Sequence, residues 1–309
     1  MKSRSVYVAL LLVQVFFATL PIAVKVAFRD FSSPALALIR VAGGALLFLV
    51  IQRIMVGERI RSRRDYVELA VYSLFGVIAN QLLYITALSL TTATAAQTFV
   101  AAGPALTLLT AIALRKETAS RLKWGGIVLA AAGSLLLVGV GGSRGAALGN
   151  LLALLNVTCY SIYLVISRGL LKRYHPLTVI TWVFVFGVPG MLPWGAGPVL
   201  REAASASALT WAAMAYIILI PTVAAYYLNV YALAHVESSV VSVFVYVQPV
   251  LTGVLAVTIL GEHTSARLIP AAILIFAGVM VTALAARRER VPPRPARDID
   301  EVVEDAEPG

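Results

Sequence analysis

The sequence predicts an all-α integral membrane protein whose ten transmembrane helices form two inverted repeats of five helices. Three observations lead to this prediction: the composition, a series of apolar segments, and an internal repeat. Of the 309 residues, 60% are hydrophobic and 13% are charged, whereas a soluble domain has about 25% charged residues. The formal net charge of +10 does not indicate nucleic-acid binding, because the basic residues separate apolar runs instead of gathering on one face.

Each apolar segment is long enough to cross a bilayer, whose hydrocarbon core of about 30 Å requires about 20 residues of helix. The predicted transmembrane helices cover residues 5–28, 34–52, 67–89, 92–114, 122–140, 148–167, 176–195, 209–230, 237–260 and 267–286. The first is too long for a signal peptide and leads directly into the second, so we expect it to be retained. The tail, 287–309, is rich in proline and charge, which predicts a disordered cytoplasmic segment.

The distribution of Lys and Arg predicts the orientation. If the N-terminus is cytoplasmic and the ten helices alternate, most basic residues outside the helices fall on the cytoplasmic side. The opposite side then holds only Arg29, Arg144, Arg201 and Arg267. By the positive-inside rule, both termini are predicted to be cytoplasmic and the protein to lie in the cytoplasmic (inner) membrane.

An internal repeat divides the predicted helices into two groups of five. A shift of 145 residues places "FVAAGPALT" (Phe99–Thr107) over "FVYVQPVLT" (Phe244–Thr252) and aligns the third to fifth helices with the eighth to tenth without a gap. An odd number of helices per repeat inverts the second copy in the membrane. The predicted units are 1–142, 143–286 and the tail 287–309, and inverted repeats are typical of secondary transporters, which bind substrate between the copies.

Two repeated stretches carry a resemblance to a known family. They are "PALTLLTAIALRKETASRLKWGGIVLAAAG" (Pro104–Gly133) and "PVLTGVLAVTILGEHTSARLIPAAILIFAG" (Pro249–Gly278). With five-plus-five helices, they resemble the EamA-type family of the drug/metabolite transporter superfamily. The chain departs from the usual family pattern at Lys116, at Pro270 and at Phe17–Ala18. The resemblance implies a transporter of small metabolites such as amino acids, working in the direction of export.

Charged residues are nearly absent from the interior of the predicted helices. All 15 Asp and Glu residues lie in connections, at helix ends or in the tail, whereas Lys25 and Arg40 lie inside helices, in the predicted outer third of the membrane. An ionised group within a bilayer usually lines a polar path, so both could attract an anionic group of a substrate. Alternatively, Lys25 extends to the interface, and Arg40 binds helix-end carbonyls or Asp30.

Uncharged polar and aromatic residues form stripes on several predicted helices. Such stripes face protein or water, because lipid cannot satisfy their hydrogen bonds. They suggest a central cavity, although each residue alone could equally bond neighbouring helices. The predicted substrate-binding residues are Lys25, Arg40, Asn80, Tyr84, Gln97, Tyr160, Tyr163, Asn229, Ser242 and Tyr246.

Two prolines are predicted hinges. Pro104 and Pro249 each remove a backbone hydrogen bond in the middle of a predicted helix, which favours a kink. Glu117 and Glu262 end the fourth and ninth helices, just before Ser120 and Ser265, and we expect these residues to act in capping.

These features together favour a secondary transporter that works by alternating access, with a small molecule as substrate and lipid as its surroundings. No cofactor, metal or nucleic acid is expected, and we expect a monomer or a weak homo-oligomer. The sequence has no nucleotide-binding motif, no HExxH and no paired aspartates inside helices. Enzymatic activity is therefore not expected. The alternative is a membrane-embedded protein that does not transport, either a sensor or scaffold or an intramembrane enzyme.

Overall fold

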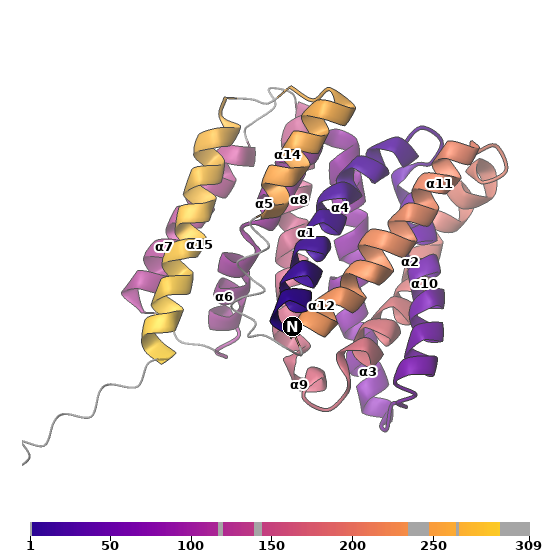
Figure 1. The fold of residues 1–309 in the computed structure, drawn as a ribbon, viewed down its shortest axis with the longest axis horizontal. Coiled ribbons are helices and arrows are strands. Elements are labelled where there is room, and N and C mark those ends of the chain that lie inside the picture. The colour runs from indigo at the N-terminus through magenta and orange to yellow at the C-terminus, as the bar shows by residue number, and fades with distance from the viewer. Residues whose placement is uncertain (1, 117–119, 139–143, 234–246, 264–265, 291–309) are drawn as a thin grey trace, which may run out of the picture.

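The computed structural model describes residues 2–116, 120–138, 144–233, 247–263 and 266–290. Within these residues, all regular secondary structure is helical (Figure 1). The elements are α1 (Lys2–Ala27), α2 (Ser33–Met55), α3 (Arg63–Ser73), η1 (Leu74–Ala79), α4 (Asn80–Leu90), α5 (Ala93–Val100), α6 (Gly103–Ala113), α7 (Arg121–Val138), α8 (Arg144–Ile166), α9 (Arg168–Leu171), α10 (Pro176–Glu202), α11 (Ala208–Ile217), η2 (Ile218–Ala224), α12 (Ala225–Leu233), α14 (Val247–Leu260) and α15 (Leu268–Arg290).

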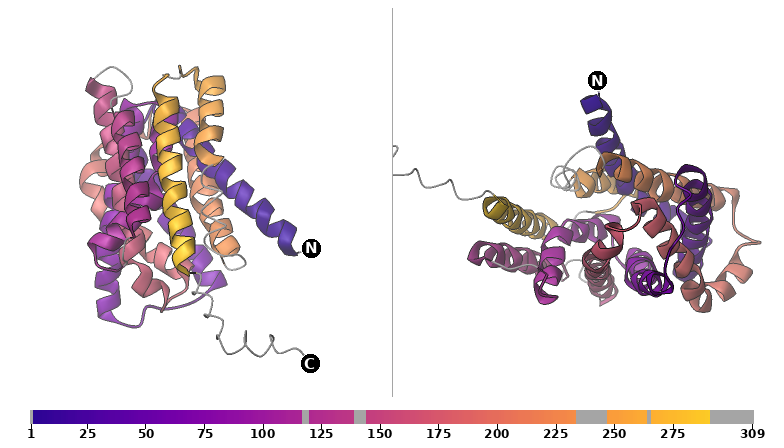
Figure 2. Two further views of the ribbon diagram at one scale, coloured as in Figure 1. Left: turned by 90° about the vertical axis from the view of Figure 1, so that its left-hand side faces the viewer. Right: turned by 90° about the horizontal axis from the view of Figure 1, so that it is seen from below.

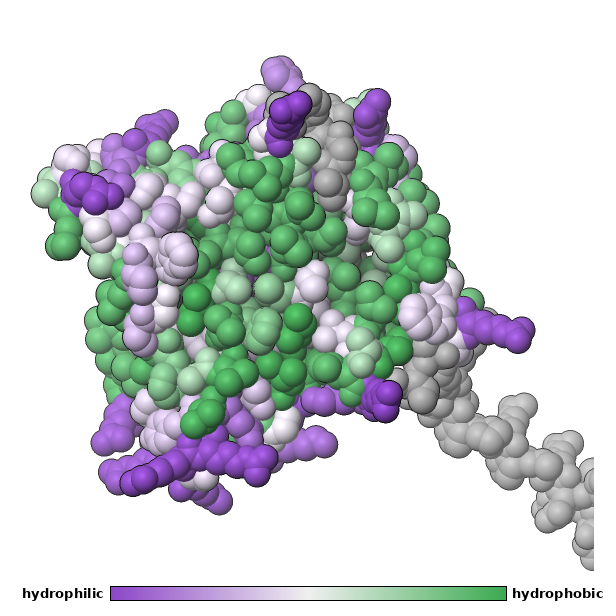
Figure 3. All heavy atoms as spheres, turned by 180° about the vertical axis from the view of Figure 1, so that it is seen from behind, coloured by the Kyte–Doolittle hydropathy of each residue, from purple (hydrophilic) through white to green (hydrophobic). Residues whose placement is uncertain are grey.

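The helices have the length and the surface of a membrane protein. Within the described residues, six helices are long and apolar enough to cross a bilayer, or seven if the bent pair α5 and α6 counts as one; Val247–Leu260 and Leu268–Thr282 are shorter apolar helices. Figure 3 shows a broad hydrophobic band with hydrophilic residues concentrated toward its two ends. The chain is therefore an integral membrane protein.

Helix pairs from the two halves of the chain organise the bundle. The most extensive contacts join α2 to α10 and α7 to α15, followed by α4 to α8 and by α1 to α12 and α14. In Figure 1, α7 and α15 form one edge, α2 and α10 lie toward the other, and α1, α4 and α8 lie between them. The first turns of α1 lean out of the bundle in both views of Figure 2.

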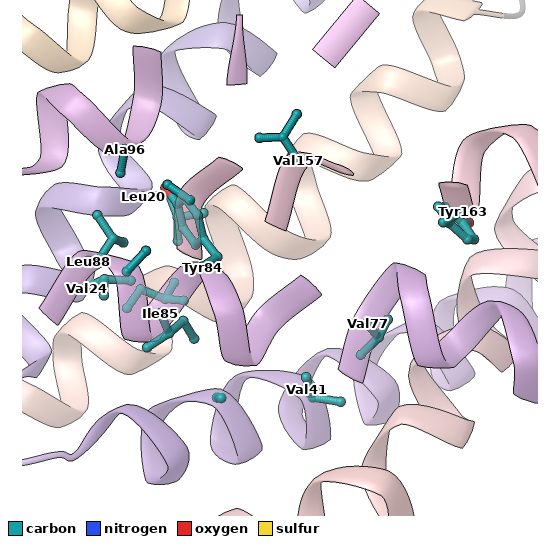
Figure 4. Close-up of a cluster of buried hydrophobic side chains, with 14 of the residues drawn as sticks. Leu20, Val24, Val41, Val77, Tyr84, Ile85, Leu88, Ala96, Val157 and Tyr163 are labelled. Carbon is teal, nitrogen blue, oxygen red and sulfur yellow. The ribbon is translucent and has the colours of Figure 1, made fainter. Parts of the chain in front are cut away.

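A continuous apolar core joins these central helices. Leu20 and Val24 of α1 lie beside Ile85 and Leu88 of α4, and all four side chains are buried (Figure 4). Burial of each such side chain stabilises a folded protein by about 1.5–3 kcal/mol when water is the alternative. In a bilayer the gain comes chiefly from close packing, because lipid tails are as apolar as the side chains.

Glycines permit the close contact of α7 with α15. A Cβ atom on Gly126 would lie 2.6 Å from the Gly278 carbonyl oxygen, and one on Gly278 would lie 2.4 Å from the Ala130 nitrogen. A Cβ on Gly133 would lie 2.8 Å from the carbonyl oxygen of Ala271. Gly126 and Gly133 correspond to Ala271 and Gly278 at the shift of 145 residues. Small residues at such positions let two membrane helices approach until their backbones touch.

The predicted helices 67–89 and 209–230 each contain a π-helical segment. The π-helical segment η1 separates α3 from α4, and η2, which contains Pro221, separates α11 from α12. Leu74 and Ala79, the ends of η1, correspond to Leu219 and Ala224 at the shift of 145 residues, so the two segments occupy equivalent positions in the sequence. Such π segments inside α-helices often occur at functional sites.

Carboxylates cap α2 and α10 reciprocally. The Glu202 carboxylate, at the end of α10, accepts hydrogen bonds from the Ser32 backbone N–H at 2.8 Å and its hydroxyl at 3.1 Å, where α2 begins. The Glu58 carboxylate, just after α2, accepts one from the His175 N–H at 2.9 Å, where α10 begins. Each helix of this pair therefore begins at a backbone N–H that is bonded by a carboxylate at, or just after, the end of its partner.

Further polar contacts fasten the ends of the neighbouring helices. Asp30 accepts hydrogen bonds from the Ser207 N–H at 2.9 Å and from the hydroxyls of Ser207 and Thr210, both at 2.6 Å, at the start of α11. These bonds lower the pKa of the Asp30 carboxyl to about 2, because they favour its charged form. At the other end of the bundle, Asp65 accepts from Arg173 at 2.6 Å and from the Tyr174 hydroxyl at 2.5 Å.

The glycine contact between α7 and α15 predicts opposite effects of two alanine substitutions. Gly278→Ala places a methyl group against backbone atoms and should destabilise the protein by about 1–3 kcal/mol. Gly125→Ala is the matched control: its Cβ would have nothing within 4 Å, and the higher helix propensity of alanine should stabilise by up to about 1 kcal/mol. Thermal unfolding in detergent measures both, and equal shifts would contradict this packing.

The capping of α11 predicts a pH-dependent effect of Asp30→Asn. Because the folded-state pKa of Asp30 lies below its unfolded value of about 3.9, its contribution to stability is present above pH 4 and is lost as the pH falls toward 2. The unfolding temperature of the wild type should therefore exceed that of the variant by a constant amount from pH 5 to 8. That difference should shrink below pH 4, and a difference that persists unchanged at pH 2 would show that the charge does not matter.

Candidate functional site

Arg40 is a buried cation with neutral hydrogen-bond partners. The side chain is 3% exposed on α2, and its Nε donates to Thr222 Oγ1 at 3.1 Å while its Nη1 donates to Gln81 Oε1 at 2.8 Å. Its Nη2 forms no hydrogen bond with any described residue. The alternative that Arg40 binds helix-end carbonyls or Asp30 is wrong, because Asp30 caps α11 and the guanidinium lies between η2 and α4.

Two tyrosines interact with this guanidinium, and two more interact with one of those tyrosines. The phenols of Tyr84 and Tyr226 are close enough to Arg40 to interact with it electrostatically, and Tyr226 interacts in the same way with Tyr160 and Tyr163. The rings of Tyr160 and Tyr163 are 5.9 Å apart. Among the described residues, none forms a hydrogen bond with the hydroxyl of Tyr160, Tyr163 or Tyr226. These polar groups from α2, α4, α8 and α12 are thus available to a ligand.

Phenylalanines hold the Tyr226 ring in place. Its centroid lies 5.8 Å from that of Phe17, 6.0 Å from Phe48 and 6.2 Å from Phe184, each in an edge-to-face arrangement. Aromatic pairs of this geometry contribute about 0.5–1.5 kcal/mol beyond the burial of their area. The direction of the Tyr226 hydroxyl is therefore fixed by the packing of its ring.

A chain of buried amides runs from Tyr84 to α1. The Tyr84 hydroxyl donates to Gln97 Oε1 at 3.4 Å, Gln97 Nε2 donates to Gln248 Oε1 at 2.6 Å, and Gln248 Nε2 donates to Gln14 Oε1 at 2.6 Å. The chain joins α4, α5, α14 and α1. Because each amide satisfies the next within an apolar bundle, this network fixes the relative positions of helices from both halves of the chain.

Asn80 pairs with Asn156 rather than with the groups around Arg40. Asn156 Nδ2 donates to the Asn80 carbonyl oxygen at 2.7 Å, and Asn80 Nδ2 donates to the Asn156 carbonyl oxygen at 3.5 Å. This reciprocal pair joins α4 to α8. It is the structural alternative that the sequence left open for such residues, namely hydrogen bonding between neighbouring helices.

Lys25 lies at one end of the bundle, in a cluster of its own. Its Nζ donates to the Thr91 carbonyl oxygen at 2.7 Å and is in electrostatic contact with Glu262. The Glu262 carboxylate accepts hydrogen bonds from the Ala93 N–H at 2.7 Å, the Thr94 N–H at 3.3 Å and the Thr94 hydroxyl at 3.1 Å. Glu262, which follows α14, therefore caps α5 from the other half of the chain, and Lys25 binds where α4 ends.

Both predicted hinge prolines lie near the first described residue of a helix. Pro104 is the second residue of α6, after a break in which the helix axis turns by 44° between α5 and α6. It starts a new helix, and in that position its missing N–H leaves no intrahelical bond unmade. Pro249 is buried as the third residue of α14, and the residues before Val247 lie outside those described.

The remaining predicted residues are placed as follows. Asn229 lies three residues after Tyr226 on α12, so the two share a helix face. Ser242 and Tyr246 lie outside the described residues, as do Glu117 and Ser265. Ser120 Oγ accepts a hydrogen bond from the Lys123 N–H at 3.4 Å, as expected of a residue that caps α7.

Sequence reasoning missed several residues of these networks. They are Gln14, Gln81, Thr222, Tyr226 and Gln248. One available signal was the repeat itself: the shift of 145 residues pairs Gln81 with Tyr226 and Tyr84 with Asn229. Two equivalent positions that both hold a polar residue indicate a helix face that is turned toward protein rather than lipid.

The amide chain predicts coupled effects on stability. Gln248→Met should destabilise the protein more than Gln14→Met. Gln248 forms hydrogen bonds with two amide side chains, whereas Gln14 forms one, with Gln248. The free energy of unfolding should fall in the double variant by about 1 kcal/mol less than the sum of the decreases in the two single variants. Thermal unfolding of the four proteins in one detergent gives this coupling, and strictly additive shifts would show that the two amides do not interact.

Comparisons with known proteins now identify the family. The model of the EamA-like transporter family matches residues 4–139 and again residues 147–284. An uncharacterized transporter of Archaeoglobus fulgidus is 27% identical over 225 residues, which are 72% of this chain and 77% of that protein. The uncharacterized transporter YetK of Bacillus subtilis is 28% identical over 211 residues, 65% of this chain and 63% of that protein.

The fold is also similar to that of a solved structure. One protein of known crystal structure is similar with a TM-score of 0.61, over 93% of this chain and 99% of the other. At 22% sequence identity, this likeness concerns the fold alone. The family model covers nearly the whole chain in two copies, and the chain therefore belongs to the EamA-like transporter family and is a membrane transporter.

Proposed function

We propose that this protein is a secondary transporter that exports small amphipathic metabolites, such as amino acids, across the cytoplasmic membrane by alternating access. The observation that carries this proposal is the cluster around Arg40. Helices of both halves of the chain contribute a buried cation and three phenols; one guanidinium nitrogen and the three phenol hydroxyls have no hydrogen-bond partner in the described part of the chain. Substrate sites of secondary transporters lie in such places, between two repeats.

The proposed architecture is ten transmembrane helices in two inverted repeats, residues 1–142 and 143–286, followed by the cytoplasmic tail 287–309. Its support is the agreement of separate features at one shift of 145 residues. The π segments η1 and η2 and the two close glycine contacts of α7 with α15 follow it, and the family model matches each half of the chain once. The distribution of basic residues supports cytoplasmic termini.

The proposed substrate site is centred on Arg40, Tyr84, Tyr160, Tyr163 and Tyr226. Gln97 joins it through Tyr84, and Asn229 lies on the same helix face as Tyr226. Ser242 and Tyr246 remain predicted contributors from the ninth predicted helix. Asn80 and Lys25 are assigned structural roles instead, because each is bonded to a neighbouring helix end or helix backbone.

Alternating access requires that each end of the bundle can open. We assign the closed end on the external side to the contact of α5 with α14, where Glu262 caps α5 and Lys25 binds the end of α4. This contact joins the two proposed repeats. The break between α5 and α6 gives the segment before Pro104 a point at which to move.

A disulfide across this contact tests the transport mechanism. A Cβ on Gly253 would lie 3.4 Å from Thr94 Cγ2, so Thr94→Cys with Gly253→Cys, in a Cys159→Ser background, places two thiols within bonding reach. In proteoliposomes loaded with a mixture of labelled amino acids, oxidation should abolish efflux and a reductant should restore it. The two single cysteine variants are matched controls and should be insensitive to the oxidant.

Two results would count against this proposal in different ways. If the unmodified protein moves no solute in these liposomes, the transporter has other substrates than amino acids. If efflux continues at the same rate with the disulfide formed, the contact of α5 with α14 does not open during transport.

A further inference from the structure

We propose that the site around Arg40 binds solutes through a carboxylate and prefers monoanionic carboxylates to zwitterions and amines. This inference rests on the proposed function and narrows its substrate class. It follows from the charge of the buried groups and from which of their hydrogen-bonding atoms are already used.

The first step concerns the uncompensated charge of Arg40. Its two protein partners, Gln81 and Thr222, are neutral, and in the described part of the chain no carboxylate forms an ion pair with it. Asp65 and Glu68 of α3 form ion pairs with Arg64 and Arg173 instead. A buried charge is costly unless an opposite charge accompanies it, so an anionic ligand would supply the counter-charge that the protein does not.

The second step concerns the donors that remain. Arg40 Nη2 has two N–H groups without a partner among the described residues, and the Tyr226 phenol interacts electrostatically with the same guanidinium. An ionised carboxylate accepts up to about four hydrogen bonds, and pairs with arginine are among the strongest in proteins. Tyr160 and Tyr163, whose rings lie 5.9 Å apart and which interact electrostatically with Tyr226, are further candidate donors to the ligand.

The third step concerns the amino group of an amino acid. An ammonium group is bound most strongly by a carboxylate, and all 15 Asp and Glu residues lie outside the interior of the predicted helices. The Gln81 and Gln97 oxygens already accept hydrogen bonds, from Arg40 and Tyr84. An amino group brought next to Arg40 would also be repelled by it. A carboxylic acid without an amine should therefore bind more tightly than its amino-acid counterpart.

A matched series of three ligands tests this inference. 4-Methylpentanoate, leucine and 3-methylbutylamine share a branched apolar chain and differ in charge. Binding to the purified full-length protein, measured by calorimetry or thermal shift, should be tightest for the acid. We expect about a tenfold weaker affinity for leucine and no measurable binding of the amine.

Substitutions connect this preference to the named groups. Arg40→Gln should weaken binding of the acid at least about tenfold, whereas Arg40→Lys retains part of it. Tyr226→Phe keeps the ring packing against Phe17, Phe48 and Phe184 and should weaken binding several-fold. Tyr227→Phe, at the exposed neighbouring position, is the control and should change nothing. If Arg40→Gln does not fold, the affinity of Tyr226→Phe for the acid still tests the inference.

Several outcomes would overturn the inference. Equal or tighter binding of leucine or the amine, no binding of the acid to wild-type protein at millimolar concentration, or unchanged affinity in Tyr226→Phe would each do so. The proposed function fails separately: a protein that moves other solutes but ignores the acid keeps its transport role and loses this specificity. A protein that binds the acid but moves no solute keeps the site and loses the transport role.

Discussion

Every polar group inside a bilayer must find its hydrogen-bond partner within the protein, and this constraint shapes the whole bundle. Helices satisfy their own backbones except at their ends. Four helix starts are capped by carboxylates that are distant in the sequence: Glu202 for α2, Glu58 for α10, Asp30 for α11 and Glu262 for α5. Each of these contacts joins the first half of the chain to the second, so capping also fixes how the halves fit together.

The same constraint explains the buried amides. Gln14, Gln97 and Gln248 form one chain, and Asn80 and Asn156 form a reciprocal pair, because an amide in an apolar bundle is stable only with a partner. The groups around Arg40 depart from this pattern. A guanidinium nitrogen and three phenol hydroxyls have no partner among the described residues, although the side chains are held by hydrogen bonds and aromatic contacts. Polar groups that are fixed in position and yet unpaired are suited to binding a solute.

The repeat connects these two observations. Arg40 lies between α4 and η2, which belong to equivalent helices of the two proposed repeats, and its neighbours Gln81 and Tyr226 are equivalent positions at the shift of 145 residues. The π segments lie beside the site around Arg40, where the wider turn brings Thr222 to the guanidinium.

The sequence by itself determined the membrane class, the family resemblance and the residue types of the site, because apolar length and the spacing of Pro, Gly and Glu are local properties of the chain. It also selected Arg40, Tyr84, Tyr160 and Tyr163, since polar residues in apolar helices are conspicuous. Only the tertiary structure decided which of them meet: it joined Tyr226 and Gln81 to Arg40, and placed Lys25 with Glu262 and Asn80 with Asn156. The physical reason is that a hydrogen bond between helices depends on their rotation and depth in the bundle, which are fixed by packing between segments 41 or more residues apart in the sequence.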